Sequence, residues 1–502
     1  MRRTKIIATL GPATESPGQI AALLERGVSV FRLNCSHASA QWVRTSVPTL
    51  RKSALEHGVT AGIMLDLQGP AIRTGDLVAP LPLTAGEPFV FTVNGTPPTG
   101  VKTTSVNYEN FARDVEVGRV LLVDNGELRM RIAAKSDTWV ECEVLNDGLL
   151  GSRRHINLPG IRVSLPALTE KDRADVALGL EVGVDFFAQS FVRDPDDVCE
   201  LRALLAGAST RPTIVAKIEH QFAVEHFAEI AQAADAVMVA RGDLGIECPY
   251  EDLPIIQRRI VKHCLHHGHP VIVATQMLES MIENPFPTRA EITDVANAVF
   301  EQADGIMLSG ETAVGRHPNE CVTVMDTIAR RIERSGGANY HLDAHLRFPR
   351  EMLMQSAVDL ANKLKAAGLM VFTRDGQLAR TAAWLRPNTT PIFAFCDGES
   401  LARQMTLLRG VHPVVMPACG NDPAGCVTGA LARLRSSGKI KTGDSIVVVL
   451  PHSSSLDNEV EAIKMHVVDD PEDKNLSNNA DGVDRTADSL TLHTPPRSLV
   501  GL

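Results

Sequence analysis

The chain has 502 residues, and its 50 Lys and Arg against 60 Asp and Glu give a formal net charge of −10. At roughly 150 residues per domain, this length predicts about three domains. The acidic balance argues against a nucleic-acid partner, because nucleic-acid binders usually present a basic face. Hydrophobic residues make up 44% and charged residues 22% of the chain, which is typical of a globular protein and excludes wholesale disorder.

The sequence shows no sign of a membrane or secretory segment. It contains no run of about 18 apolar residues, so we expect no transmembrane helix and no membrane partner. The N-terminal stretch MRRTKIIATLGPA has only a short apolar run before Gly-Pro, unlike a secretory signal. The nine cysteines form no C-x-x-C pair, and we expect reduced, mostly buried thiols. Together these features predict a cytoplasmic enzyme.

Short runs of aliphatic residues, each followed by a helix-like stretch, repeat along the chain. The runs are continuous rather than alternating, as is typical of parallel strands that are buried on both faces. In chain order we expect strands at Thr4–Gly11, Val28–Asn34, Thr60–Leu67, Asp185–Phe191, Thr213–Glu219, Ala236–Leu244, Pro270–Gln276 and Gly305–Glu311. Eight such units in succession predict an α/β fold, namely a (β/α)8 TIM barrel.

The long interval between the third and fourth strands has a different pattern. Alternating segments such as RVLLVDNGELRMRIAAK, punctuated by Asn-Gly, predict an inserted antiparallel β domain that lies over the barrel mouth as a lid. After about Gly336 a further α/β sheet is expected, followed by an acidic tail poor in large apolar residues. We therefore expect a catalytic barrel at 1–75 and 160–336, a lid domain at 76–159, a C-terminal α/β regulatory domain at 337–468 and a disordered tail at 469–502.

Polar and charged residues gather where the predicted barrel strands end. TIM-barrel active sites lie at the carboxyl ends of the strands. One such residue would usually be a satisfied core group, but six strands with the same feature point to ligand binding, since burial of unpaired charges costs several kcal/mol each by rough estimate. The residues at these ends are Arg32, Asn34, Ser36, His37, Asp66, Lys217, Glu219, Arg241, Asp243, Thr275 and Glu311.

Glu219 and Asp243 follow neighbouring strands and have the chemistry of a hard-cation site. Two carboxylates, completed by waters and substrate oxygens, suit Mg²⁺. The alternative is that they form ion pairs with Lys217 or Arg241. We favour the metal because an anionic substrate would need both cations. Lys217 lies two residues before Glu219 and faces the same side of the strand, so an ammonium would sit beside the metal, which suits a migrating phosphoryl group.

From Thr4 to about Val468 the chain resembles the pyruvate kinase family. The resemblance rests on KIIATLGPAT, VFRLNCSHAS, LDLQGPAIRTG, INLPGIRVSLPALTEKD, VAKIEH, VMVARGDLGIE, ATQMLESMIENPFPTRAEITDVANAV and DGIMLSGETAVGRHP, in that order. It implies transfer of the phosphoryl group of phosphoenolpyruvate to ADP, which gives pyruvate and ATP in the last step of glycolysis. It also implies Mg²⁺, for which Mn²⁺ can substitute, and a homotetramer.

The resemblance also implies roles for individual residues. The implied catalytic residues are Lys217, which stabilises the phosphoryl group and the enolate, Thr275, which lies on the route of enolate protonation, and Arg73. The substrate would bind at Arg32, Lys217, Ala240, Arg241, Gly242, Asp243 and Thr275, and the nucleotide at Asn34, His37, Arg73 and Arg154. Glu219 and Asp243 match the Mg²⁺ ligands.

Two regions depart from the family pattern. In LDLQGPAIR, Leu67 and Gln68 replace Thr and Lys, and Ala71 replaces a Glu that helps create the need for K⁺. K⁺ could still bind at Asn34, Ser36, Asp66 and the carbonyl of Leu67, which leaves the K⁺ dependence open. The C-terminal domain departs most, because TRDGQLART and PHSSSLDNEV replace the family's phosphate-binding stretches, so we do not expect fructose 1,6-bisphosphate as the effector. Thr373, Arg374 and Ser453–Ser455 could still bind a smaller phosphate, but a plain loop explains these residues equally well.

Two other functions fit parts of the sequence. A Mg²⁺-dependent lyase that acts on 2-oxo acids could use the same barrel and paired acids, but it would need neither a nucleotide lid nor a third domain. A degenerate kinase kept as a metabolite-binding regulator would normally have lost Lys217, Glu219 or Asp243, and all three are present.

Overall fold

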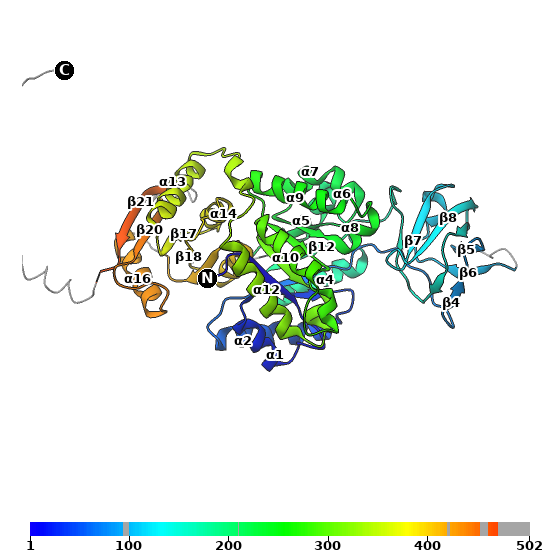
Figure 1. Cartoon of the computed structure of the whole chain (residues 1–502), viewed down its shortest axis with the longest axis horizontal. Helices are drawn as coiled ribbons and strands as arrows, with labels where there is room; N and C mark the ends of the chain where they lie inside the picture. The colour runs from blue at the N-terminus through cyan, green and yellow to red at the C-terminus, as the bar shows by residue number, and fades with distance from the viewer. Residues whose placement is uncertain (94–99, 209, 419–421, 452–459, 470–502) are drawn as a thin grey trace, which may run out of the picture.

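The structure is a computed structural model that describes residues 1–93, 100–208, 210–418, 422–451 and 460–469. It is elongated, with three parts along its long axis (Figure 1). A β/α barrel occupies the middle, a small β-domain lies at one end, and an α/β sheet lies at the other. This arrangement confirms the predicted fold class.

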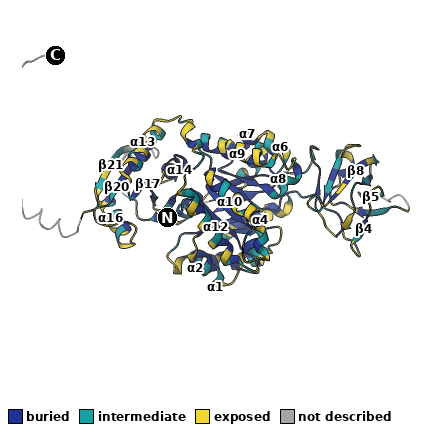
Figure 2. Cartoon of the chain, in the orientation of Figure 1, coloured by how far each residue is buried: buried dark blue, intermediate teal, exposed yellow. Residues whose placement is uncertain are grey.

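The barrel is closed by eight parallel strands in the order β1-β16-β15-β14-β13-β12-β3-β2. The strands are β1 (Lys5–Thr9), β2 (Val28–Asn34), β3 (Gly62–Asp66), β12 (Phe186–Gln189), β13 (Thr213–Ile218), β14 (Ala236–Ala240), β15 (Val271–Ala274) and β16 (Gly305–Leu308). The helices around them are α1 (Pro17–Glu25), α2 (Ala40–Glu56), α4 (Glu170–Val182), α5 (Pro195–Leu204), α6 (Gln221–Glu225), α7 (Phe227–Ala233), α8 (Arg241–Glu247), α9 (Leu253–His267), α10 (Arg289–Phe300), α11 (Gly310–Ala313) and α12 (Pro318–Glu333). Buried residues follow the strands, and exposed residues follow the outer helix faces (Figure 2).

Most barrel strands end one or two residues earlier than the sequence predicts, and two of them end three or four residues earlier. The sixth, expected to reach Leu244, ends at Ala240, and the eighth, expected to reach Glu311, ends at Leu308. In both cases a helix begins almost at once: α8 starts at Arg241 and α11 at Gly310. The sequence prediction erred because short apolar runs do not distinguish a strand from the first turn of a helix. As a consequence, Asp243 lies in a first helical turn rather than on a strand.

The inside of the barrel is filled by alternating strand residues, as in other closed barrels. Fully or nearly fully buried side chains from all eight strands form one cluster, which includes Ile7, Met64, Val215, Met238 and Met307. Leu407, from the short helix η3 (Met405–Leu407), joins this cluster from the C-terminal part of the chain. One end of the barrel is therefore closed by an apolar plug, which leaves the other end for polar residues.

The inserted part has its own apolar core, built around Phe89, Phe91 and Phe111. Its main sheet has the order β11-β7-β8-β9-β5-β6, and all its pairs are antiparallel except β5 with β6. The elements are β4 (Leu81–Leu83), β5 (Pro88–Thr92), β6 (Lys102–Ser105), α3 (Phe111–Asp114), β7 (Val120–Val123), β8 (Leu128–Lys135), β9 (Trp139–Val144), β10 (Gly148–Leu150) and β11 (Ile156–Asn157). We refer to this part as the lid. The residue boundaries predicted for the domains stay predictions.

The C-terminal part is a five-stranded sheet in the order β19-β18-β17-β20-β21, in which β21 is antiparallel. Its elements are η2 (Tyr340–Asp343), which precedes it, α13 (Pro349–Leu364), β17 (Gly368–Phe372), α14 (Gln377–Trp384), β18 (Ile392–Cys396), α15 (Glu399–Gln404), η3, β19 (Val411–Val415), α16 (Pro423–Ser436), β20 (Ser445–Pro451) and β21 (Val460–Val467). A buried ion pair joins it to the barrel, with Arg386 Nη2 at 2.6 Å from Asp304 Oδ2.

Several sequence predictions concern residues at the margin of the description. Ser453–Ser455 and the tail from residue 470 onward lie outside the described residues. Seven cysteines are free, but Cys426 takes part in a disulfide bond, so the expectation of reduced thiols fails there. Its spacing carried no C-x-x-C signal that would have shown this. Among the described residues, none of the helices combines the length and apolar character that a bilayer crossing requires.

Candidate active site

A cavity of about 340 Å³ lies between the carboxyl ends of the barrel strands and the lid. Its walls come from strand ends far apart in sequence and from two lid segments. The lining residues are Arg32, Asn34, Ser36, Asp66, Leu67, Gln68, Ala71, Arg73, Asp124, Asn125, Ser152, Arg153, Arg154, His155, Ser190, Phe191, Lys217, Glu219 and Asp243. Most of the residues singled out from the sequence therefore meet here.

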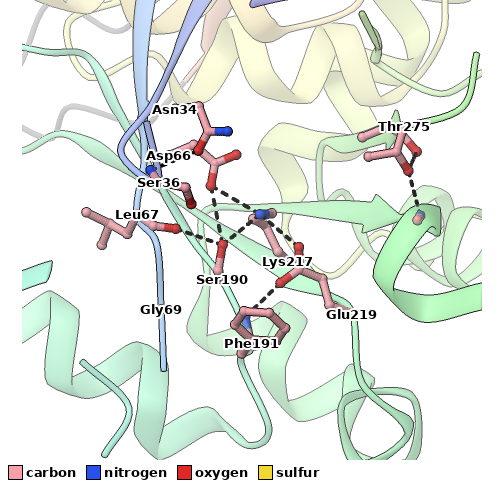
Figure 3. Close-up of polar contacts among 12 residues, drawn as sticks. Asn34, Ser36, Asp66, Leu67, Gly69, Ser190, Phe191, Lys217, Glu219 and Thr275 are labelled. Atoms are coloured by element: carbon pink, nitrogen blue, oxygen red, sulfur yellow. Dashed lines mark hydrogen bonds and ion pairs between the residues drawn. The ribbon is translucent and has the colours of Figure 1, made fainter. Parts of the chain in front are cut away.

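Lys217, at the end of β13, lies at the centre of a buried polar cluster (Figure 3). Its Nζ atom is 2.8 Å from Glu219 Oε1 and 3.1 Å from Asp66 Oδ1, and it donates a hydrogen bond to Ser190 Oγ at 2.7 Å. Asp66 also accepts from Arg32 Nε at 2.6 Å. Two cations and two carboxylates thus alternate at the floor of the cavity.

The charges of this cluster are set by their neighbours. Burial opposes the charge on Lys217, but the carboxylates of Asp66 and Glu219 outweigh it and raise the pKa of Lys217 above its usual value. Burial alone would raise the pKa of Asp66, yet Arg32 and Lys217 hold it below its usual value. Lys217 is therefore a fixed ammonium and Asp66 a fixed carboxylate at neutral pH.

Glu219 and Asp243 are the two acids that could hold a metal ion. Burial, together with the charge of Asp243, raises the pKa of Glu219 to about 7, although Lys217 opposes this shift. Its Oε2 atom accepts from Phe191 N at 2.8 Å. A buried carboxylate that is destabilised by a second one is an environment that a divalent cation relieves, so the donor set fits one. Within the described ranges, no three His, Cys, Asp or Glu side chains are grouped around one point, so further ligands would have to be waters or substrate oxygens.

The ion pair with Lys217, weighed above as the alternative to a metal, is present, whereas the pair with Arg241 is not. Arg241 is buried and turned toward other elements, where it contacts Asp294 at 2.5 Å and donates to Thr275 O at 2.6 Å. The Arg241 side chain is therefore excluded from substrate binding, and only its backbone N–H, at the start of α8, remains a candidate. Glu311 also lies outside the cavity, buried in α11, where it accepts from Leu278 N and Ser309 N.

Thr275, just after β15, lies apart from the Lys217 cluster (Figure 3). Its Oγ1 accepts from Gly242 N at 2.7 Å and donates to Ala274 O at 2.6 Å. Its φ of 66° is in the left-handed region, as is that of Phe191 at 54°. Such backbone costs of the order of 1–3 kcal/mol and is concentrated at functional sites. Thr275 thus braces the turn that begins α8 after Ala240, next to Asp243.

The four residues considered for K⁺ gather on one side of the cavity (Figure 3). The oxygens of Asn34, Asp66 and Leu67 already accept hydrogen bonds. Asn34 Oδ1 accepts from Ser36 N at 3.1 Å, and the Leu67 carbonyl accepts from Ser190 Oγ at 2.8 Å. Asp66 is paired with two cations. The oxygens could take a monovalent cation, but their negative charge is largely compensated within the chain.

The lid side of the cavity carries two of the four predicted nucleotide residues, Arg73 and Arg154. Arg73 forms an isolated β-bridge with His155 and donates to Arg153 O at 3.1 Å. Arg154 Nη1 is 3.2 Å from Asp124 Oδ1. His37 is exposed and is not among the lining residues, although its backbone N–H donates to Asn34 O at 3.1 Å.

Sequence reasoning gave no role to several residues that line the cavity, among them Ser190, Phe191 and His155. Ser190 links Lys217, Asp66 and Leu67 through one hydroxyl. Its position at the end of the fourth strand was a signal that could have been used. His155 packs against Phe191, with ring centroids 5.6 Å apart. No pattern in the sequence around His155 predicts that contact, because the two residues come from different parts of the chain.

Comparisons with known proteins agree with this geometry. The family model "Pyruvate kinase, barrel domain" matches residues 1–322, and "Pyruvate kinase, alpha/beta domain" matches residues 351–464. A protein named pyruvate kinase from Staphylococcus aureus (strain USA300) is 38% identical over 477 residues, which are 94% of this chain and 81% of that protein. One from Staphylococcus epidermidis (strain RP62A) is 37% identical over the same share. A crystal structure of a pyruvate kinase from Cryptosporidium parvum has a TM-score of 0.87 and 33% identity, and the match covers 93% of this chain and 96% of that one.

Proposed function

The chain belongs to the pyruvate kinase family, and on that premise we propose which residues perform its phosphoryl transfer. It is a phosphotransferase with pyruvate kinase function: phosphoenolpyruvate gives its phosphoryl group to ADP, and pyruvate and ATP are formed. The observation that carries the assignment of residues is the buried Lys217, held between Glu219 and Asp66 at the floor of a cavity that also has arginines in its walls.

We assign the transferring phosphoryl group to Lys217 and Arg32. Both cations are buried and held by carboxylates, so they are already oriented before substrate binds. Fixed positive charge in a site shielded from water stabilises the negative charge that develops on the phosphoryl oxygens and the enolate. We expect the backbone N–H groups of Ala240–Gly242, at the start of α8, to face the substrate carboxylate, for which the Gly242 N–H would have to leave the Thr275 hydroxyl to which it donates at 2.7 Å.

Members of this family need a divalent metal, and we assign Mg²⁺ here to Glu219 and Asp243, with Mn²⁺ able to substitute. Bound there, the ion would supply positive charge to carboxylate and enolate oxygens. The support is the all-oxygen donor set and the repulsion that the half-buried Asp243 exerts on the buried Glu219. Glu219 is oriented by the Phe191 N–H, which leaves its other oxygen paired with Lys217.

Thr275 is assigned to the side of the site where the enolate takes up its proton. Its hydroxyl is fixed in direction by the Gly242 N–H and the Ala274 carbonyl. A hydroxyl fixed in this way can hold a proton-carrying water in place. Arg73 and Arg154 are assigned to the nucleotide phosphates, and Asn34 and His37 to the nucleotide side of the same opening. Closure of the lid would bring the lid residue Arg154 onto ADP.

Three further proposals rest on family membership more than on the site. We expect a homotetramer, a cytoplasmic location in keeping with seven free cysteines, and a phosphorylated effector at Thr373 and Arg374. Thr373 is buried, and its Oγ1 accepts from Gly376 N at 2.9 Å. The effector therefore has the weakest support of the three.

The function is tested by pyruvate formation from phosphoenolpyruvate and ADP in a coupled assay, with and without K⁺. We expect turnover that requires Mg²⁺ and ADP, and that falls by less than about tenfold when tetramethylammonium replaces K⁺. The reason is that Arg32 and Lys217 already compensate Asp66, and Ala71 adds no charge. A loss of a hundredfold or more would show that K⁺ completes the site. A titration that shows no ADP binding would instead favour the lyase.

A further inference from the structure

A second buried polar cluster lies beneath the attachment of the lid, outside the cavity described above. It lines a small cavity of about 50 Å³ whose walls come from the barrel and from the segment that leads out of the lid. Three of its polar lining residues are Asn157, His220 and Glu247; Arg193 lines it as well, and so does His155, which it shares with the cavity described above. Asn157 and Glu247 are 3% and 5% exposed. None of the three has been given a role so far.

Glu247 contacts two different elements. Asn157 Nδ2 donates to its Oε1 atom at 2.9 Å. Asn157 belongs to β11, which pairs with β7 in the lid sheet with Asn157 opposite Leu122. This buried hydrogen bond therefore joins the lid sheet to the end of α8 in the barrel.

The other oxygen of Glu247 faces His220. His220 Nε2 lies 3.4 Å from Glu247 Oε2. The His220 Nδ1 atom accepts from Phe222 N at 3.3 Å, which places the ring proton on Nε2, toward Glu247. The two side chains are therefore in close contact, although the Nε2 and Oε2 atoms do not form a hydrogen bond in this arrangement.

These contacts place one carboxylate between the lid and both candidate metal ligands. Glu247 ends α8, and Asp243 lies in the first turn of that same short helix. His220 directly follows Glu219. A shift of the lid strand would therefore be transmitted through one side chain to the segments that carry Glu219 and Asp243.

The buried carboxylate of Glu247 has few groups around it that stabilise its negative charge. Its Oε2 atom and Asn157 Oδ1 have no hydrogen-bond partner among the described residues. Burial raises the pKa of Glu247 to about 7, and the hydrogen bond from Asn157 only partly offsets this. Unsatisfied buried polar atoms are costly, and such groups are concentrated at functional sites. We call the contact between Asn157 and Glu247 the joint. An apolar residue in place of Glu247 would stabilise the joint better.

We propose that Glu247 is a positioning residue that couples closure of the lid, through Asn157, to the arrangement of Glu219 and Asp243. The inference rests on the proposed function of those two acids. To test it, one substitution must remove the contact of Glu247 with Asn157, and another must alter its contact with His220. Asn157→Ala removes only the hydrogen bond between Glu247 and the lid. Glu247→Gln keeps a hydrogen bond with Asn157, since either amide can turn to supply donor or acceptor, but it removes the negative charge that faces His220 Nε2 on the side of the proposed metal ligands.

The test compares wild type, Asn157→Ala, Glu247→Gln and the double variant by three measurements: kcat and KM for ADP, Mn²⁺ affinity without nucleotide by electron paramagnetic resonance, and thermal midpoint. We expect Asn157→Ala to raise the KM for ADP about tenfold and to leave Mn²⁺ affinity within about twofold. Glu247→Gln should raise the KM and weaken Mn²⁺ binding about fivefold. The double variant should be no worse than Glu247→Gln, because both changes act on one link.

Arg131→Gln is the matched control, because it removes a lid ion pair, Arg131 to Glu143, that is exposed and away from the joint. It should change none of the three measurements appreciably. The inference is overturned if the two single effects multiply in the double variant, or if only the thermal midpoint falls. If wild type makes no ATP from phosphoenolpyruvate, the proposed function fails instead, while Mn²⁺ affinity and hydrogen exchange of the 153–158 segment still report on the coupling.

Discussion

Lys217→Met should lower kcat for ATP formation by about a thousandfold or more, because it removes the fixed positive charge that faces the transferring group. The variant keeps the length of the side chain but leaves Glu219 without its 2.8 Å partner. The coupled assay at saturating Mg²⁺, phosphoenolpyruvate and ADP measures the effect. Lys52→Met, which changes an exposed lysine on α2, is the matched control and should retain wild-type turnover.

Loss of folding must be separated from loss of chemistry in this variant, since breaking a buried ion pair is strongly destabilising. The thermal midpoint and oxalate binding serve for that purpose, and Lys217→Arg provides a second variant that keeps the charge in a different geometry. A folded Lys217→Met protein with turnover within tenfold of wild type would refute the role given to Lys217.

Glu219→Gln should raise the Mg²⁺ concentration for half-maximal activity by at least about a hundredfold, because it replaces an anionic ligand with a neutral one. Mn²⁺ affinity without substrate should fall in parallel. Glu311→Gln is the matched control: Glu311 is also a buried acid near a strand end, but it lies outside the cavity. That control should lower stability without changing the metal requirement. Equal metal dependence in the two variants would contradict the assignment.

The sequence was sufficient to predict the barrel and most of the site. Val28–Asn34 was predicted with its observed bounds, because apolar content and a polar end define a buried parallel strand. Lys217 and Glu219 could be placed on one face because the strand repeat fixes the direction of alternate side chains. The contact of Lys217 with Glu219 agrees with that reasoning.

What could not be predicted depends on contacts between distant segments. Ser190 contacts Lys217 and Asp66 because three strand ends converge, and no local pattern contains that information. Asp243 and Glu311 follow strands that turn into helices, and a short apolar run does not reveal the turn. The joint of Asn157 with Glu247 spans the lid insertion, so only the folded chain brings the two together.

The central claim is that Glu219 and Asp243 hold the metal while Lys217 faces the reacting group. Anomalous diffraction from a crystal grown with Mn²⁺ and oxalate, a compact analogue of the enolate, locates the ion directly. The account predicts one Mn²⁺ peak bound by both carboxylates and by oxalate, with Lys217 Nζ directed at the oxalate. A peak bound elsewhere, or a Glu219 that still pairs only with Lys217, would contradict it.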